Sequence, residues 1–187
     1  MDYDDLDVED VTGNANKKAK VKSGAKGKSA ERDIVHILNN HFEALLAKNP
    51  AWGKFSRSVG SGNRWGQKVD LPQHAKDTFT GDLCTPQNFL WVIESKKGYN
   101  DIDLCTAFSG KCTELDDFLK QVTDDSGRCG RKPMLLWKKD RKPRLAFMRK
   151  EDNKTFNVMR YYFVYGEWVG MTLDELLAIK ENRFFFS

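Results

Sequence analysis

The feature that most constrains this chain is an uninterrupted apolar run over residues 89–93 (FLWVI), followed directly by Glu94, Ser95 and Lys96. A short apolar run between polar residues is typical of a strand that is buried on both faces of a sheet. Residues two apart on a strand project from the same face, so Glu94 and Lys96 are predicted to point the same way. A carboxylate and an ammonium group at the end of a buried strand must be paired, hydrated or bound to a metal.

Hydrophobic periodicity predicts helices on either side of this strand in the sequence. Apolar residues at helical spacing favour a helix over 30–48, with Ser29 as its N-cap, and a second helix over 114–124. The glycine-containing segment 125–130 is expected to end the second helix. A capping box at residues 172–175 (TLDE) predicts a short last helix that extends to about residue 180.

Further strands are predicted from short apolar and β-branched runs at 134–137, 145–148 and within 156–169. The stretch 51–80, rich in glycine, serine and basic residues, favours the start of a strand followed by a long loop. A chain in which helices and strands alternate in this way buries its apolar surface as a sheet flanked by helices. The predicted fold class is therefore α/β, with a central mixed sheet.

Charge is distributed unevenly along the 187 residues. The formal net charge is +4, but residues 1–10 contain six acids and no base, and removing that charge of −6 leaves +10 on the rest of the chain. Residues 1–28 are predicted to be a disordered tail, residues 29–150 the core, and residues 151–187 a C-terminal extension that packs on it. The basic body favours a phosphate-bearing partner, and the lysine-rich second half of the tail either lies along DNA or is merely solvated.

Membrane, disulfide-rich and zinc-binding proteins are poor matches to this composition. No apolar run approaches the roughly 20 residues that span a bilayer, and the acidic N-terminus lacks the basic start and apolar middle of a secretory signal. The chain is therefore expected to be soluble and cytoplasmic, without a membrane partner. None of its four cysteines forms a CxxC pair and its three histidines show no ligand spacing, which favours reduced thiols over a zinc site.

An acid upstream of the apolar run completes a possible metal site. Asp82 follows Gly81 and lies twelve residues before Glu94, far enough for a neighbouring antiparallel strand to bring it alongside. Mg²⁺ commonly takes one or two carboxylates together with water and substrate phosphate. Asp82, Glu94 and the main-chain carbonyl of Ser95 could supply oxygen ligands, and the metal would polarise a phosphodiester and acidify a bound water. Lys96 could orient that water or stabilise the charge of the transition state.

Glu31 is an acid aligned with the apolar stripe of the first predicted helix. It either lies in the first turn and answers the helix dipole, or points into a polar site and binds a second ion or an outer-shell water. The pattern of Asp82, Glu94 and Lys96 also has a simpler interpretation, because such triplets arise by chance in a chain with 31% charged residues. On these residues alone, a strand that runs into a solvated turn is the more frequent explanation.

Four motifs in a fixed order give the chain a resemblance to a known family. They are residues 27–32 (GKSAER), 55–62 (FSRSVGSG), 81–82 (GD) and 93–96 (IESK). In this order, over about residues 26–148, they resemble the archaeal-type Holliday junction resolvases of the PD-(D/E)xK nuclease superfamily, and especially their phage-encoded relatives. The resemblance implies a restriction-endonuclease-like core and a homodimer that cuts branched or four-way DNA with Mg²⁺, for which Mn²⁺ is expected to substitute. A phage-encoded protein would act in the host cytoplasm.

The resemblance also implies roles for individual residues. By position, Asp82, Glu94 and Lys96 match the catalytic signature, with Glu31 as the acid on the first helix. Residues that contact DNA or support catalysis in the family correspond here to Arg32, Arg57 and Ser61, and Gln121 matches a polar residue that some relatives place near the metal. Two rivals of Asp82, Asp70 and Asp77, lie in the stretch 63–80; Gly81 and the strand that starts soon after favour Asp82.

Basic loops add candidate phosphate contacts. The candidates are Arg57, Arg64 and Lys68 in the first long loop, and Lys138, Lys139, Arg141, Lys142 and Arg144 in the second. Phosphate contacts position a duplex without identifying its sequence, which suits a structure-selective enzyme, although an ordinary solvated hairpin explains residues 138–144 equally well. A duplex or restriction-type nuclease, a nickase, and a catalytically inactive DNA-binding accessory protein remain open alternatives to a junction-cutting enzyme.

Overall fold

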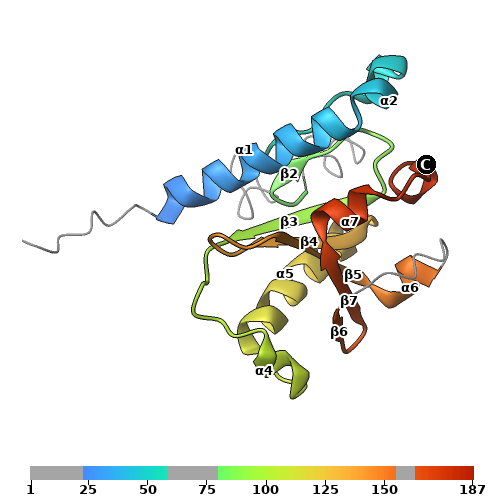
Figure 1. Cartoon of the computed structure of the whole chain (residues 1–187). Helices are drawn as coiled ribbons and strands as arrows, with labels where there is room; N and C mark the ends of the chain where they lie inside the picture. The colour runs from blue at the N-terminus through green and yellow to red at the C-terminus, as the bar shows by residue number, and fades with distance from the viewer. Residues whose placement is uncertain (1–22, 59–79, 155–162) are drawn as a thin grey trace, which may run out of the picture.

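The computed structural model describes residues 23–58, 80–154 and 163–187. At its centre is a five-stranded mixed sheet with helices packed on both faces and the strand order β3-β4-β5-β7-β6 (Figure 1). The first two strands are parallel and the later pairs are antiparallel. The strands are β3 (Trp91–Lys97), β4 (Lys132–Lys138), β5 (Arg144–Arg149), β6 (Phe163–Tyr165) and β7 (Trp168–Thr172). The predicted α/β class is confirmed, and the arrangement is consistent with a restriction-endonuclease-like core.

A short pair of antiparallel strands, β1 (Ser56–Arg57) and β2 (Leu83–Cys84), lies beside β3. The segment just before β2 is hydrogen-bonded to β3, since the Asp82 amide donates to the Ile93 carbonyl at 3.0 Å. The strand start predicted within 51–80 corresponds to β1, and residues 59–79 lie outside the described residues.

α5 (Thr113–Cys129) is the crossover that makes β3 and β4 parallel, since parallel neighbours need a long connection, usually a helix. A short helix, α4 (Cys105–Phe108), precedes it. The end predicted for this helix, at residue 124, is wrong. Gly127 lies inside α5, and the helix ends instead at Gly130, which adopts the left-handed conformation with a φ of 69° and donates its amide to the Ser126 carbonyl at 2.8 Å.

The helix predicted over 30–48 is divided into α1 (Ser23–His41) and α2 (Glu43–Lys48). α1 begins seven residues earlier than predicted, so Ser29 lies inside it and is not its N-cap. Residues 23–28, placed in the tail by composition, therefore belong to the helix, because alanine and lysine in this stretch can extend the hydrogen-bond ladder. The buried face recurs at every fourth residue and consists of Ala30, Ile34, Leu38, Phe42 and Leu46.

β3 is buried on both faces, as the apolar run predicted. Trp91, Val92 and Ile93 expose 1% of their surface or less. Trp91 and Ile93 pack into the apolar cluster under α1, whereas Val92 packs into a second cluster under α5. Alternate residues of β3 therefore point toward different helices, and this alternation sets the direction of the polar residues that follow.

The C-terminal segment adds two strands and a helix to the same core. Further strand was predicted within residues 156–169; their described part contains β6 and the start of β7, which pair as an antiparallel hairpin. The helix α7 (Leu173–Leu177) begins with the predicted cap, because the Glu175 amide donates to the Thr172 hydroxyl at 3.2 Å, but it ends three residues before 180. The short helices α6 (Lys150–Lys154) and η3 (Asn182–Phe184) complete this part of the chain, and a 3-10 turn η1 (Pro50–Trp52) follows α2.

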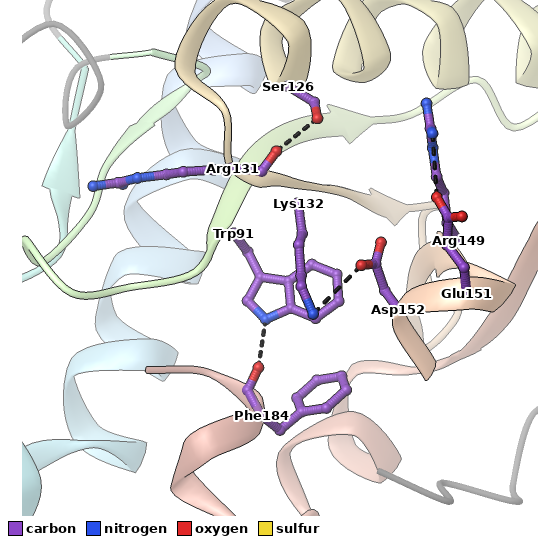
Figure 2. Close-up of polar contacts among 8 residues, drawn as sticks. All are labelled: Trp91, Ser126, Arg131, Lys132, Arg149, Glu151, Asp152 and Phe184. Atoms are coloured by element: carbon purple, nitrogen blue, oxygen red, sulfur yellow. Dashed lines mark hydrogen bonds and ion pairs between the residues drawn. The ribbon is translucent and has the colours of Figure 1, made fainter. Parts of the chain in front are cut away.

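The last residues of the chain are hydrogen-bonded to the start of β3 (Figure 2). The Trp91 indole Nε1 donates to the Phe184 carbonyl at 2.9 Å, and the Leu90 amide donates to the Phe185 carbonyl at 2.8 Å. The Lys132 ammonium lies 5.4 Å from the centre of the Trp91 ring and 3.4 Å from the Asp152 carboxylate. The C-terminal segment thus lies on the core rather than apart from it.

Two further properties bear on the class of protein. All four cysteines lie in the described part of the chain and are free thiols; Cys84 and Cys112 are buried, Cys129 is half-buried and Cys105 is exposed. Among the described helices, none combines the length and apolar character that crossing a membrane requires.

Candidate active site

Polar side chains from four separate segments gather at the C-terminal end of β3. They are Glu94 and Lys96 on β3, Asp82 before β2, Glu31 on α1 and Gln121 on α5. Glu94 and Lys96 share the face of Val92, the face that packs against α5. The alternation of a buried strand therefore directs both charged groups toward the helix that carries Gln121.

Asp82 is fixed to β3 by its backbone and by its side chain. Its amide donates to the Ile93 carbonyl at 3.0 Å, and its Oδ2 accepts from the Ser95 amide at 2.9 Å. This close approach depends on Gly81, whose φ is +83° and whose position leaves no room for a Cβ: one placed there would lie 2.7 Å from the Ile93 carbonyl oxygen. Steric crowding therefore explains why a glycine precedes Asp82.

Lys96 lies between a carboxylate and an amide. Its Nζ is 2.6 Å from Oε1 of Glu94 and donates to Oε1 of Gln121 at 2.7 Å. The same ammonium lies 5.4 Å from the centre of the Phe118 ring, where a cation is attracted to the aromatic face. Lys96 is therefore held in place by β3 and α5 together.

The two carboxylates of the site are both buried, with 2% of Glu94 and 8% of Asp82 exposed. The pKa of Glu94 is raised to about 8, chiefly by burial and then by the negative charge of Asp82, while Lys96 opposes the shift. Burial also raises the pKa of Asp82, with a smaller contribution from Glu31, while the Ser95 amide and Lys96 lower it. Two buried acids side by side are difficult to ionise together, because their negative charges repel each other. A bound cation would offset this repulsion, so the pair favours cation binding.

Glu31 lies at the edge of this cluster and is paired with an arginine. Its Oε2 accepts from the Arg57 Nε at 2.7 Å, and its charge contributes to the raised pKa of Asp82. Of the two interpretations left open for Glu31, the geometry agrees with a side chain that points into a polar site. Arg57, predicted to contact DNA, is hydrogen-bonded to Glu31 through one of its nitrogens.

Comparison with known proteins bears on this arrangement. A family model described as "Phage putative PDDEXK endonuclease" matches residues 22–185. The chain belongs to this family. No curated protein and no solved structure matches it.

Membership of the phage PDDEXK endonuclease family supports the predicted placement of this chain in the PD-(D/E)xK superfamily. Asp82, Glu94 and Lys96, the residues predicted to form the signature of that superfamily, lie together although twelve residues separate the first acid from the second. Nucleases of this superfamily act on DNA and generally use divalent metals, so the class of chemistry is hydrolysis of a phosphodiester.

The donor set fits a divalent cation of the magnesium type. Asp82 and Glu94 are two carboxylates, the number that Mg²⁺ commonly takes with water and substrate phosphate completing its shell. In the described ranges, no three His, Cys, Asp or Glu side chains are arranged to hold an ion by themselves. A site built on two carboxylates therefore needs water and substrate oxygens, as substrate-assembled magnesium sites do.

Other predicted residues make no contact with Asp82 or Glu94 that the described structure shows, or lie outside the described residues. Arg32, Arg141 and Lys142 are exposed. Lys139 donates its ammonium to the Ile102 carbonyl and lies 5.6 Å from the centre of the Trp137 ring, so it is engaged within the protein. Five residues fall outside the described ranges: the predicted contacts Ser61, Arg64 and Lys68, and the rival acids Asp70 and Asp77.

Asp125 is an acid near the site that was not among the predicted residues. It is buried on α5, one turn after Gln121, and pairs with Arg128 at 3.0 Å. Burial raises the pKa of Asp125, and its charge adds to the raised pKa of Glu94. Asp125 lies four residues after Gln121, and residues four apart share one face of a helix. This spacing would have identified Asp125 only if the helix had been predicted to continue past residue 124.

Proposed function

We propose that this protein is a metal-dependent endodeoxyribonuclease whose active site is formed by Asp82, Glu94 and Lys96. The observation that carries the proposal is the buried pair of carboxylates, Asp82 and Glu94, set beside the ammonium group of Lys96 at the open end of a strand. Burying two acids together is costly, and a fold retains such a pair where a cation is to be bound.

Magnesium, when bound, would polarise a phosphoryl oxygen and acidify a water molecule. The side chains of Asp82 and Glu94 and the main-chain carbonyl of Ser95 would hold it, and Glu31 is placed to hold a second ion or a water in the outer shell once Arg57 releases it. Mn²⁺ has the same preference for carboxylate oxygens and is expected to substitute.

The protein's own groups supply position and charge. Lys96 donates from Nζ to Glu94 and to Gln121, which lie 2.6 and 2.7 Å away. An ammonium group held this firmly can orient a water molecule toward a phosphate or stabilise the negative charge that develops on it, without reorganising during the reaction. Gln121 acts through Lys96 and is a positioning residue.

The proposed substrate is branched DNA, in particular a four-way junction, cut by a homodimer. The order of the motifs and their resemblance to junction resolvases support this choice, as does the excess of positive charge outside residues 1–10. The proposed contacts to the DNA backbone are Arg32, Arg57, Ser61, Arg64, Lys68, Lys138, Arg141 and Lys142. Lys139 could contact DNA only after its hydrogen bond to the Ile102 carbonyl breaks.

Cleavage assays with labelled four-way junctions, flaps and linear duplexes test the proposal. Wild-type protein is compared with Lys96→Ala, and with Lys120→Ala as a matched control, because Lys120 is an exposed lysine on α5 beside Gln121. We expect symmetrical nicks near the junction centre with Mg²⁺ or Mn²⁺ and none with a chelator. Lys96→Ala should bind the junction and not cut it, while Lys120→Ala should behave as wild type.

Each alternative has its own outcome in these assays. Undiminished cleavage by Lys96→Ala would refute the site. Equal cutting of linear duplex would replace the junction substrate by a duplex or restriction-type nuclease, and a single nick would indicate a nickase. Junction binding with no cleavage by the wild type under any divalent metal would leave an inactive DNA-binding protein.

A further inference from the structure

Three basic residues stand side by side on the other face of the same strand end. Lys97, Lys138 and Arg144 are Cα partners on the adjacent strands β3, β4 and β5. Lys97 lies four residues after Ile93, which packs under α1, so this row of side chains points to the α1 face. We name these three residues the basic row. In Figure 1 the end of β3 and the β4–β5 turn lie beside the N-terminal half of α1.

Arg144, at the inner end of the basic row, is a buried cation with unused donors. It exposes 9% of its surface, and its Nε and Nη1 atoms have no hydrogen-bond partner in the described structure. Burial lowers the pKa of this guanidinium group, and the charge of Asp33 on α1 opposes that effect. Among the described residues, Asp33 is the one carboxylate whose charge acts noticeably on Arg144. A buried cation with free donors is unfavourable unless an anion completes it.

Ser95 adds a second unused donor on the same face. It lies between Ile93 and Lys97 on β3, and its buried hydroxyl oxygen has no partner among the described residues. Lys97 and Lys138 are only half-buried, so the outer part of the basic row remains accessible from solvent. Clustered cations together with free donors are complementary to an oxyanion such as phosphate.

We propose that the basic row binds a phosphate of the DNA backbone, on the face of β3 opposite to Glu94 and Lys96. Lys97 and Lys138, whose backbones are roughly 5 Å apart across the sheet, contact the phosphate, and Arg144 adds its charge from behind. Lys97 directly follows Lys96, so a duplex that crosses the end of the sheet reaches the active site and the row together. The proposal rests on the proposed function, because it takes the ligand to be DNA.

The test measures DNA affinity of the full chain in a chelator, across a series of salt concentrations. Lys97→Gln, Lys138→Gln and the double variant are compared with Lys180→Gln, an exposed lysine after α7. We expect the double variant to bind duplex and junction at least about tenfold more weakly, with a salt slope smaller by about one to two. Lys180→Gln should match wild type. Wild-type affinity and slope in the double variant would overturn the proposal.

A second measurement separates DNA from free phosphate as the source of the ligand. Because Arg144 is buried, its variant is not relied on for binding. Instead, inorganic phosphate should raise the melting temperature of wild type more than that of the double variant, since a ligand stabilises the state that binds it. Phosphate stabilisation without any change in DNA affinity would assign the row to free phosphate and overturn the DNA contact.

The two proposals fail in different ways. A wild-type protein that neither binds nor cuts DNA contradicts the proposed function. A wild type that cuts DNA, together with a double variant that binds and cuts equally well, contradicts the basic row alone. A double variant that binds weakly but cuts at the wild-type rate when saturated with DNA supports a contact that contributes to DNA binding and not to the chemical step.

Discussion

The two ends of β3 have opposite characters within one strand of seven residues. At the first end, Trp91 is fully buried, its indole donates to the Phe184 carbonyl, and the Phe184 ring packs against it with the ring centres 5.1 Å apart. At the second end, Glu94 is almost as deeply buried but is a carboxyl group beside another carboxyl group, and the Ser95 hydroxyl has no partner within residues 23–58, 80–154 and 163–187. The first end is apolar and well packed, whereas the second end buries acidic groups and the Ser95 hydroxyl.

The comparison indicates that stability and activity depend on different parts of the same strand. Apolar burial at the first end stabilises the fold, and it holds the backbone on which the second end is built. Buried acids at the second end reduce stability in the absence of a cation, a cost that folds tolerate at functional sites. Substitutions at the two ends should therefore change stability in opposite directions.

The largest effect is expected from Trp91→Ala. Removing a fully buried indole should lower the free energy of unfolding by about 3–5 kcal/mol, because a cavity forms and the contact with Phe184 is lost. Chemical denaturation followed by circular dichroism measures this value. Trp52→Ala is the matched control; Trp52 is only half-buried, so its loss should cost less. Equal effects of the two substitutions would show that the first end of β3 has no special role in stability.

Glu94→Gln should produce the reverse combination. We expect cleavage to fall roughly 10²–10³-fold, as when a single preorganised electrostatic group is removed from an active site. In metal-free buffer the variant should be more stable than wild type, because a buried acid with a raised pKa becomes a neutral amide of the same shape. Thermal unfolding with a chelator, with the exposed Glu114→Gln as control, measures the second effect; a less stable variant would contradict it.

The pH dependence of metal-free stability should identify the same residue. Glu94 has a pKa of about 8 in the folded protein against an ordinary value of 4.5, so the folded state binds more protons between these values. The free energy of unfolding should therefore be highest below pH 4.5 as far as this group is concerned, and should fall by on the order of 4 kcal/mol as the pH rises to about 8. Glu94→Gln should flatten this slope, and a divalent metal should reduce it by competing with the proton.

Much of the first end of β3 and the signature at the second could be predicted from the sequence. The apolar run of residues 89–93 determines a strand buried on both faces, and a spacing of two places Glu94 and Lys96 on one face, whichever fold surrounds them. Gly81 also carried a signal, since only glycine permits the close approach of Asp82 to the Ile93 carbonyl. These inferences depend on local geometry, which short stretches of sequence specify.

The features that could not be predicted depend on contacts between distant segments. The pairing of Glu31 with Arg57 joins residues 26 apart, and the burial of Arg144 follows from the register of three strands. Asp125 was missed because the segment 125–130 was predicted to end a helix that in fact continues to Cys129. A glycine ends a helix only when the chain reverses there, and that reversal is set by the packing of α5 on the sheet.

The smallest effect is expected from Gln121→Ala, which removes the side chain that accepts a hydrogen bond from Lys96. Gln121 is exposed and accepts one hydrogen bond from Lys96, so Gln121→Ala should change stability by no more than about 0.5 kcal/mol. Loss of one hydrogen bond to a charged group corresponds to roughly a tenfold to hundredfold lower kcat. KM should stay unchanged, because Gln121 positions Lys96 and does not touch DNA.

Two comparisons decide whether that small effect arises from positioning. Gln121→Glu keeps an acceptor for Lys96 and should recover most of the activity, whereas Lys120→Ala, on the neighbouring exposed position, should change neither kcat nor KM. A Gln121→Ala variant combined with Lys96→Ala should be no slower than Lys96→Ala alone, because the amide acts only through the ammonium group. If the two losses multiply instead, Gln121 has a contact of its own with the substrate, and the second end of β3 extends onto α5.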